Sequence, residues 1–107
     1  MEVTFKNSVL KKLCENHKQL KRVYGSLQSE RIIKRINEFV AAENFYDISR
    51  LPQARLHPLV GNLKEYWAVD IINQYRILLK PSNGSIEDLL SITQVQIMEI
   101  GKEDYHK

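Results

Sequence analysis

The chain has little cysteine, proline or glycine, and it has no long apolar segment. Its 107 residues include one cysteine, three prolines and four glycines. The single cysteine, Cys14, excludes an internal disulfide and fits the reducing cytoplasm. It falls on an apolar helical stripe, so we expect a small core residue rather than a reactive thiol. No apolar run is long enough to span a membrane, and there is no signal-peptide pattern. We expect one cytoplasmic domain, residues 1–107.

Motifs that mark several large enzyme classes are missing as well. No P-loop, GxGxxG, HExxH, CxxC or GxSxG pattern occurs, so nucleotide-cofactor, zinc-hydrolase and serine-hydrolase functions have no support. The three histidines and Cys14 lack the close spacing of zinc ligands, and we expect neither a metal nor a cofactor. The 16 basic and 13 acidic side chains give a net charge of +3, a mild preference for polyanions.

Two apolar patterns divide the chain into a helical half and a strand half. Residues 2–6 alternate as a short strand. Helical spacing then covers 8–24 and 26–42, and Gly25 is placed to end the first helix. Because only a few residues join these two helices, we expect an antiparallel hairpin.

From Arg55 onward the apolar period changes to two, which indicates strands. We expect an irregular edge strand at 56–60 and further strands at 66–72, 75–80 and 90–100. In the strand at 66–72, we expect Trp67 to face the core. Helices that precede such strands predict an α+β fold, with an N-terminal strand and a two-helix hairpin packed on a twisted antiparallel sheet.

Side chains suited to acid–base chemistry gather in the second half of the chain: His57, Arg76, Asp104, Tyr105 and His106. Imidazoles move protons near neutral pH, and a guanidinium matches the oxygens of a phosphate. Together such groups can stabilise a pentavalent phosphate without a metal, which is the chemistry of an RNase.

The same residues also allow interpretations without a catalytic role. His57 suits a hydrogen-bonded strand histidine, and Arg76 suits an exposed cross-strand partner of Asp70 or Glu99. The last five residues suit a charged tail. Tyr66, on the face of Asp70, is the better candidate for stacking on a base.

The chain resembles the RelE/ParE superfamily of bacterial type II toxins, and within it the HigB-type toxins. The resemblance covers nearly the whole chain and is carried by an ordered series of segments: the Val23-Tyr24-Gly25 break, Leu51 to Gly61 (LPQARLHPLVG), Tyr66 to Asp70 (YWAVD), Tyr75 to Ile77 (YRI) and Asp104 to His106 (DYH). It implies a compact RelE-like fold.

The resemblance also implies an activity, ribosome-dependent cleavage of translated mRNA. By the family pattern the catalytic group is His57, Asp104, Tyr105 and His106, with Arg76 on the phosphate. Lys64 is the cation nearest to a position that is often basic in the family. Electrostatic contact with ribosomal RNA is expected from four lysines: Lys11, Lys12, Lys18 and Lys21. The alternative interpretation is that these lysines only form the solvated face of a helix.

Expected partners follow from the same resemblance. They are an antitoxin with a helix-turn-helix domain, the ribosome with its mRNA, and operator DNA only through the antitoxin complex. Two alternative functions remain. One is a ParE-like toxin that inhibits gyrase without cleaving RNA, and the other is an inactive member that only binds its antitoxin. His57 and the Asp-Tyr-His segment speak against the first, and intact His57, Arg76, Tyr105 and His106 speak against the second.

Overall fold

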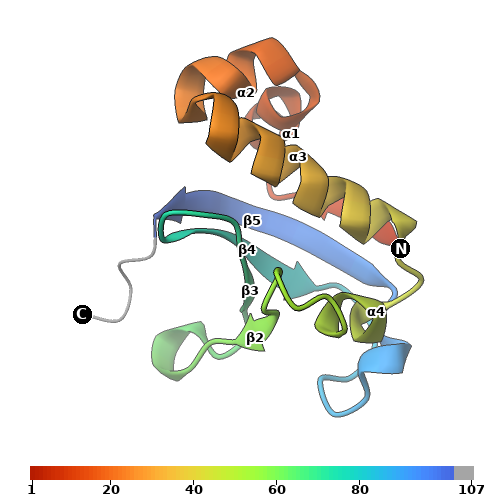
Figure 1. The fold of residues 1–107 in the computed structure, drawn as a ribbon. Coiled ribbons are helices and arrows are strands. Elements are labelled where there is room, and N and C mark those ends of the chain that lie inside the picture. The colour runs from red at the N-terminus through yellow and green to blue at the C-terminus, as the bar shows by residue number, and fades with distance from the viewer. Residues whose placement is uncertain (103–107) are drawn as a thin grey trace.

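The computed structural model of the protein describes residues 1–102. The elements of this range are, in order, β1 (Glu2–Phe5), α1 (Ser8–Glu15), α2 (His17–Tyr24), α3 (Ser26–Ala41), α4 (Phe45–Ser49), β2 (His57–Pro58), η1 (Gly61–Leu63), β3 (Trp67–Asp70), β4 (Tyr75–Pro81), η2 (Leu89–Ser91) and β5 (Gln94–Lys102). Figure 1 shows α1, α2 and α3 stacked over one face of the sheet. Within residues 1–102, no helix is long and apolar enough to cross a membrane.

The strands form a five-stranded sheet in the order β1-β5-β4-β3-β2. Strands β2 to β5 pair antiparallel as predicted, but β1 pairs with β5 in parallel. Parallel neighbours need a long connection between them, and the helices and strands after β1 supply it. The α+β class is therefore confirmed, while the antiparallel sheet is corrected to a mixed one.

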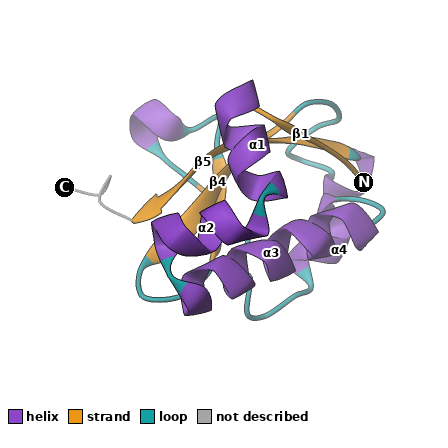
Figure 2. Ribbon diagram, turned by 90° about the horizontal axis from the view of Figure 1, so that it is seen from above, coloured by secondary structure: helices purple, strands orange, loops and turns teal. Residues whose placement is uncertain are grey.

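The first predicted helix is broken into α1 and α2 at Asn16 (Figure 2). The backbone of Asn16 is extended, with φ −108° and ψ 92°, and its Oδ1 accepts a hydrogen bond from the N–H of Gln19 at 3.0 Å. An asparagine side chain competes for backbone N–H groups, so it favours a cap over a helix interior. The layer over the sheet consequently contains α1, α2 and α3 instead of the predicted hairpin of two helices.

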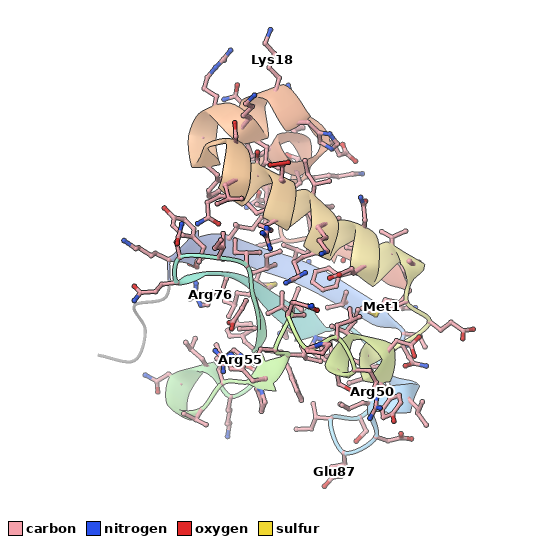
Figure 3. All side chains as sticks on the ribbon, viewed as in Figure 1. Met1, Lys18, Arg50, Arg55, Arg76 and Glu87 are labelled. Atoms are coloured by element: carbon pink, nitrogen blue, oxygen red, sulfur yellow. The ribbon has the colours of Figure 1, made fainter. Side chains whose placement is uncertain are left out.

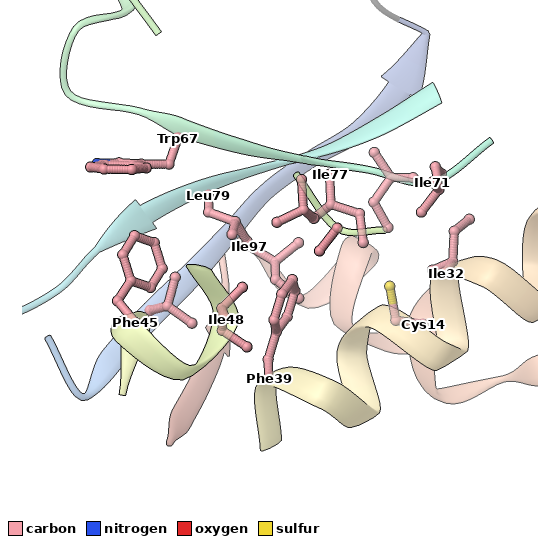
Figure 4. Packing of buried hydrophobic residues seen from close by; sticks show 14 of the residues in the cluster. Cys14, Ile32, Phe39, Phe45, Ile48, Trp67, Ile71, Ile77, Leu79 and Ile97 are labelled. Atoms are coloured by element: carbon pink, nitrogen blue, oxygen red, sulfur yellow. The ribbon is translucent and has the colours of Figure 1, made fainter. Parts of the chain in front are cut away.

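The main core lies between this helical layer and the sheet. Leu20, Ile32 and Phe39 are fully buried there against strand residues such as Ile77. Trp67 is 9% exposed, and its ring meets that of Phe45 edge-on with centroids 5.3 Å apart (Figure 4). The prediction that Trp67 faces the core is confirmed. Fully burying an aliphatic or phenylalanine side chain such as Ile32 or Phe39 stabilises the fold by about 1.5–3 kcal/mol.

The last strand begins later than predicted, because a short helix precedes it. Residues Leu89–Ser91 form η2, and the carboxylate of Asp88 caps it by accepting from the N–H of Leu90 at 3.2 Å. The loop before η2 is tied to β5, since Oδ1 of Asn83 accepts from the N–H groups of Thr93 and Gln94 at 3.0 Å each. Side-chain hydrogen bonds therefore shape a segment whose apolar pattern indicates a strand.

A bulge in β5 changes which of its side chains are buried. Leu78 pairs with Glu99 while the next residue, Leu79, pairs with Ile97, so β5 has one residue more than β4 at this point. An extra residue resets the alternation of a strand. Ile100 therefore joins Ile97 in the core, although a strand that alternated regularly would put these two residues on opposite faces.

Candidate active site

The sheet face that points away from α1 to α3 carries two of the predicted catalytic residues. His57 pairs with Ala68 across β2 and β3, and Asp70 pairs with Arg76 across β3 and β4. Residues directly opposite one another project from the same face, as do residues two apart on one strand. Since Ala68 and Asp70 are two apart, His57, Asp70 and Arg76 share this face, which we call the site face.

A small apolar cluster forms the floor of the site face. Its buried members are Leu59, Ala68 and Leu78, and its partly buried members are Leu63, Tyr66 and Met98. The cluster lies between His57 and Arg76 in the register, because Ala68 pairs with both His57 and Leu78. Polar groups at its border therefore stand beside an apolar surface, where charge interactions are stronger than in water.

His57 lies in β2, the two-residue edge strand that Pro58 ends. A proline has no N–H to donate, so it occurs at edges rather than within a sheet. The Nδ1 of His57 is 2.7 Å from the carbonyl oxygen of Arg55. The prediction that His57 is a hydrogen-bonded histidine in a strand is thus confirmed. The contact engages one ring nitrogen and so is compatible with proton transfer at the other.

Arg76 is only 4% exposed. Its Nη1 donates to the carbonyl oxygens of Gly101 and Lys102 at 3.5 Å each, where β5 ends. The alternative prediction that Arg76 is an exposed cross-strand partner of Asp70 or Glu99 is therefore wrong, because the side chain is buried. Buried charges are screened less by water and salt than surface charges, so the guanidinium acts strongly on any group that comes close to it.

Sequence reasoning missed Arg55, which binds the carboxylate of Asp70. The Nε of Arg55 is 2.6 Å from Oδ2 and its Nη2 is 3.2 Å from Oδ1, a bidentate pair. Its backbone has φ 45°, in the left-handed region that side chains other than glycine rarely adopt. The sequence pattern offers no signal for this conformation. The carboxylate of Asp70, which the sequence offered as a partner for Arg76, thus pairs with Arg55.

Arg35 is a second residue that the sequence did not reveal. It lies on α3, is 1% exposed, and its Nε donates to the carbonyl oxygen of Asp70 at 2.9 Å. Its Nη1 is 3.0 Å from Oε1 of Glu38. A signal did exist, because Arg35 falls on the same helical stripe as Ile32 and Phe39, and a cation on an apolar stripe needs a buried partner.

Three predicted catalytic residues, Asp104, Tyr105 and His106, lie outside the described residues. The described chain ends in β5, where Lys102 pairs with Tyr75 at the start of β4. Arg76 follows Tyr75 directly, so the last described residue lies beside Arg76.

The predicted RNA contacts fall on two sides of the molecule. Lys64 and Tyr66 border the site face, where the Nζ of Lys80 is 6.0 Å from the centroid of the Tyr66 ring. Beside them is an open groove of about 460 Å³, lined by Lys64, Glu65, Lys80, Pro81, Ser82, Asn83, Gly84 and Ile86. The exposed cations Lys11, Lys12, Lys18 and Lys21 belong to α1 and α2. Figure 3 shows Lys18 on the outer side of the helical layer, with the sheet between it and Arg55.

Two groups with shifted pKa values lie on the helical side of the sheet and outside the site face. Burial raises the pKa of the Cys14 thiol to about 11, with a smaller contribution from the charge of Glu15. Burial also raises the pKa of Tyr24, whose hydroxyl donates to the carbonyl oxygen of Ile100 at 3.2 Å. The prediction that Cys14 is a core residue is confirmed.

Comparisons with known proteins agree with this architecture. A YoeB/ParE toxin from Agrobacterium tumefaciens has a similar solved structure, with a TM-score of 0.58 and 15% sequence identity over 97% of this chain and 100% of that chain. At this identity the likeness concerns the fold alone. A search of curated proteins found no match. The family model described as the RelE-like toxin of the type II toxin-antitoxin system HigB matches residues 3–91. The chain therefore belongs to the HigB-like family of RelE-like toxins from type II toxin–antitoxin systems.

Proposed function

We propose that the protein is a ribosome-dependent endoribonuclease that cleaves translated mRNA without a metal and so inhibits translation and growth. The observation that carries the proposal is that His57 and Arg76 share one face of the sheet, across an apolar floor. A proton carrier and a buried cation on one face are two of the groups that the cleavage of a phosphodiester at a ribose uses.

Three further residues complete the proposed catalytic group: Asp104, Tyr105 and His106. His106 follows Lys102 by four residues, and four residues span at most about 14 Å. Because Lys102 ends β5 beside Arg76, this length suffices for a role at the site face. Tyr105 would position or relay a proton, and Asp104 would orient a histidine or the edge of a base.

The proposed reaction begins at the ribose 2′-hydroxyl. A histidine takes its proton, the 2′-oxygen attacks the adjacent phosphorus, and the bond from phosphorus to the 5′-oxygen breaks. The leaving 5′-oxygen takes a proton from a second acid. The products are a 2′,3′-cyclic phosphate and a free 5′-hydroxyl. Arg76 stabilises the charge that builds up on the phosphate in the transition state.

RNA binding is proposed for both sides of the molecule. On the site face, Lys64 meets phosphates and Tyr66 stacks on a base. The groove beside them offers a path for the neighbouring nucleotides, with Lys80 as a further cation. On the helical layer, Lys11, Lys12, Lys18 and Lys21 contact ribosomal RNA. The ribosome then positions the mRNA, which reduces the binding that the small toxin must supply itself.

The family implies an antitoxin as partner. We propose that this antitoxin has a helix-turn-helix domain and that operator DNA is bound only through the toxin–antitoxin complex. The site of action is the cytoplasm, where translated mRNA occurs.

Brief expression in a bacterium, followed by mapping of new 5′ ends on mRNA, tests the proposal. We expect growth arrest with new ends inside translated codons, and we expect both to disappear in His57→Gln and His106→Ala and when translation is blocked beforehand. Growth arrest without new ends would contradict the proposal and point to gyrase inhibition. Absence of arrest by the wild type would also contradict the proposal and would favour an inactive family member that only binds its antitoxin.

A further inference from the structure

We propose that Arg55 and Asp70 are positioning residues that hold His57 in the tautomer of a general base; this inference rests on the proposed cleavage reaction. The starting point is the distance of 2.7 Å between Nδ1 of His57 and the carbonyl oxygen of Arg55. A carbonyl oxygen has no proton to donate, so Nδ1 must carry the hydrogen of this bond. In the neutral ring the lone pair is then on Nε2, the nitrogen that can accept a proton.

The contact depends on where Arg55 places its carbonyl group. The backbone of Arg55 has φ 45°, a conformation that costs roughly 1–2 kcal/mol for a residue with a side chain. Such a conformation persists only when surrounding contacts hold it. The bidentate pair with Asp70, at 2.6 and 3.2 Å, is the contact that holds Arg55 from its side chain.

Asp70 is in turn fixed on both sides of its backbone. Its N–H donates to the carbonyl oxygen of Ala54 at 2.7 Å, and its own carbonyl accepts from the buried Arg35 at 2.9 Å. The first of these bonds also holds the residue before Arg55. A continuous series of contacts therefore runs from the interior of α3 through β3 to the ring of His57.

The series gives His57 a definite part in the proposed reaction. Nε2 takes the proton of the 2′-hydroxyl as the 2′-oxygen bonds to phosphorus, and the ring becomes positively charged. The Arg55 carbonyl, whose oxygen carries partial negative charge, stabilises that cation through Nδ1–H. The proton for the leaving 5′-oxygen then comes from a different group, and His106 is the proposed acid.

Nitrogen-15 NMR of the full-length protein with labelled histidine tests the tautomer directly. The signals of His57 are assigned by their loss in His57→Gln. Spectra are taken at about pH 8.5, where a free imidazole is mostly neutral. We expect the Nδ1–H tautomer in wild type. A spectrum showing His57 as the Nε2–H tautomer would overturn the inference, whatever the activity of the protein.

Two variants separate positioning from folding. Asp70→Asn keeps the size of the side chain and both backbone bonds, and Arg55→Gly removes the guanidinium at a residue that can adopt the left-handed backbone without strain but is no longer held in it. In each we expect a mixture of His57 tautomers and a fall in cleavage on translating ribosomes of about 10- to 100-fold, the cost of misplacing a reacting group. Glu65→Gln, which removes the carboxylate 4.0 Å from Lys80 on an exposed pair, is the control and should leave the His57 tautomer unchanged.

The outcomes distinguish this inference from the function on which it rests. Unchanged tautomer and unchanged cleavage in both variants would overturn the positioning role while leaving the nuclease intact. A shifted tautomer with full cleavage would also overturn it. A wild type that holds the Nδ1–H tautomer but cleaves no RNA would overturn the proposed function and the catalytic part of the inference together.

Discussion

Arg35 and Asp70 join the helical layer to the sheet, because the Nε of Arg35 on α3 donates to the carbonyl oxygen of Asp70 on β3 at 2.9 Å. Arg35 is 1% exposed, so its removal leaves a buried carbonyl without this donor. We expect Arg35→Ala to lower the free energy of unfolding by about 2–3 kcal/mol, the cost of losing a hydrogen bond to a charged group. Urea unfolding followed by circular dichroism measures the change. Lys34→Ala, an exposed neighbour on α3, is the control, and equal small effects in both would contradict this role.

Gly84 allows the loop before η2 to pack against Ser91. Its φ is 73°, and a Cβ built there would lie 2.4 Å from the carbonyl oxygen of Ser91. We therefore expect Gly84→Ala to lower the free energy of unfolding by more than about 1 kcal/mol, since strain and a backbone clash act together.

Two other glycines separate the contributions of strain and clash when all three Gly→Ala variants are compared by thermal unfolding. Gly25 also has a positive φ, 86°, but nothing lies within 4 Å of a Cβ there. Gly101 has ordinary backbone and only a contact of 3.9 Å. We expect the loss of stability to fall in the order Gly84→Ala, Gly25→Ala, Gly101→Ala. A Gly84→Ala variant as stable as Gly101→Ala would show that the loop packs differently.

The buried thiol of Cys14 makes stability depend on pH at the alkaline end. Its pKa rises from 9.0 to about 11 on folding, so the folded protein holds this proton more tightly than the unfolded chain. The stabilisation is complete below about pH 9 and is lost as the pH rises through 11. The raised pKa of Tyr24 acts in the same direction.

Denaturant unfolding between pH 8 and 11 checks this expectation. We expect stability to decline in that interval, and less steeply in Cys14→Ala. We also expect the native thiol to react with iodoacetamide near pH 8 far more slowly than the thiol of the unfolded chain, because the thiolate is the nucleophile. Equal rates for folded and unfolded protein would mean that Cys14 is exposed.

The lysines of α1 and α2 give a prediction about ribosome contact. Reversal of Lys11, Lys12, Lys18 and Lys21 to glutamate should weaken cleavage on ribosomes and reduce its dependence on salt, because each phosphate contact contributes to the salt slope. Lys6→Glu combined with Lys34→Glu is a smaller control for general charge effects. If the fourfold variant cleaves as well as wild type with the same salt dependence, these lysines form only a solvated helical face and do not contact ribosomal RNA.

The sequence predicted the strands, the end of a helix at Gly25 and the core position of Trp67, because each depends on a pattern within a few residues. It did not predict the break at Asn16, where side-chain capping competes with a continuous apolar stripe. The parallel pairing of β1 with β5 was also missed, since it depends on a connection that spans most of the chain. The bulge in β5 depends on the register between strands, which the alternation does not contain.

The site was predicted only in part for a similar reason. His57 and Arg76 were recognised by residue type and by family resemblance, but their shared face follows from pairing through β3. Arg55 was missed because its left-handed backbone and its pair with Asp70 arise from tertiary contacts. Glycine at this position would have been a sequence signal, and arginine is not.

The most direct measurement of the central claim is cleavage of a defined mRNA on purified ribosomes by the purified protein, with one nucleotide replaced by its 2′-deoxy form. First the cleaved bond is mapped on all-ribose mRNA and the 3′ product end is analysed. We predict a cyclic phosphate, a 5′-hydroxyl, and no cleavage at that bond when its 2′-hydroxyl is removed. Cleavage that persists at the 2′-deoxy nucleotide, or absence of cleavage of the all-ribose mRNA, would contradict the account.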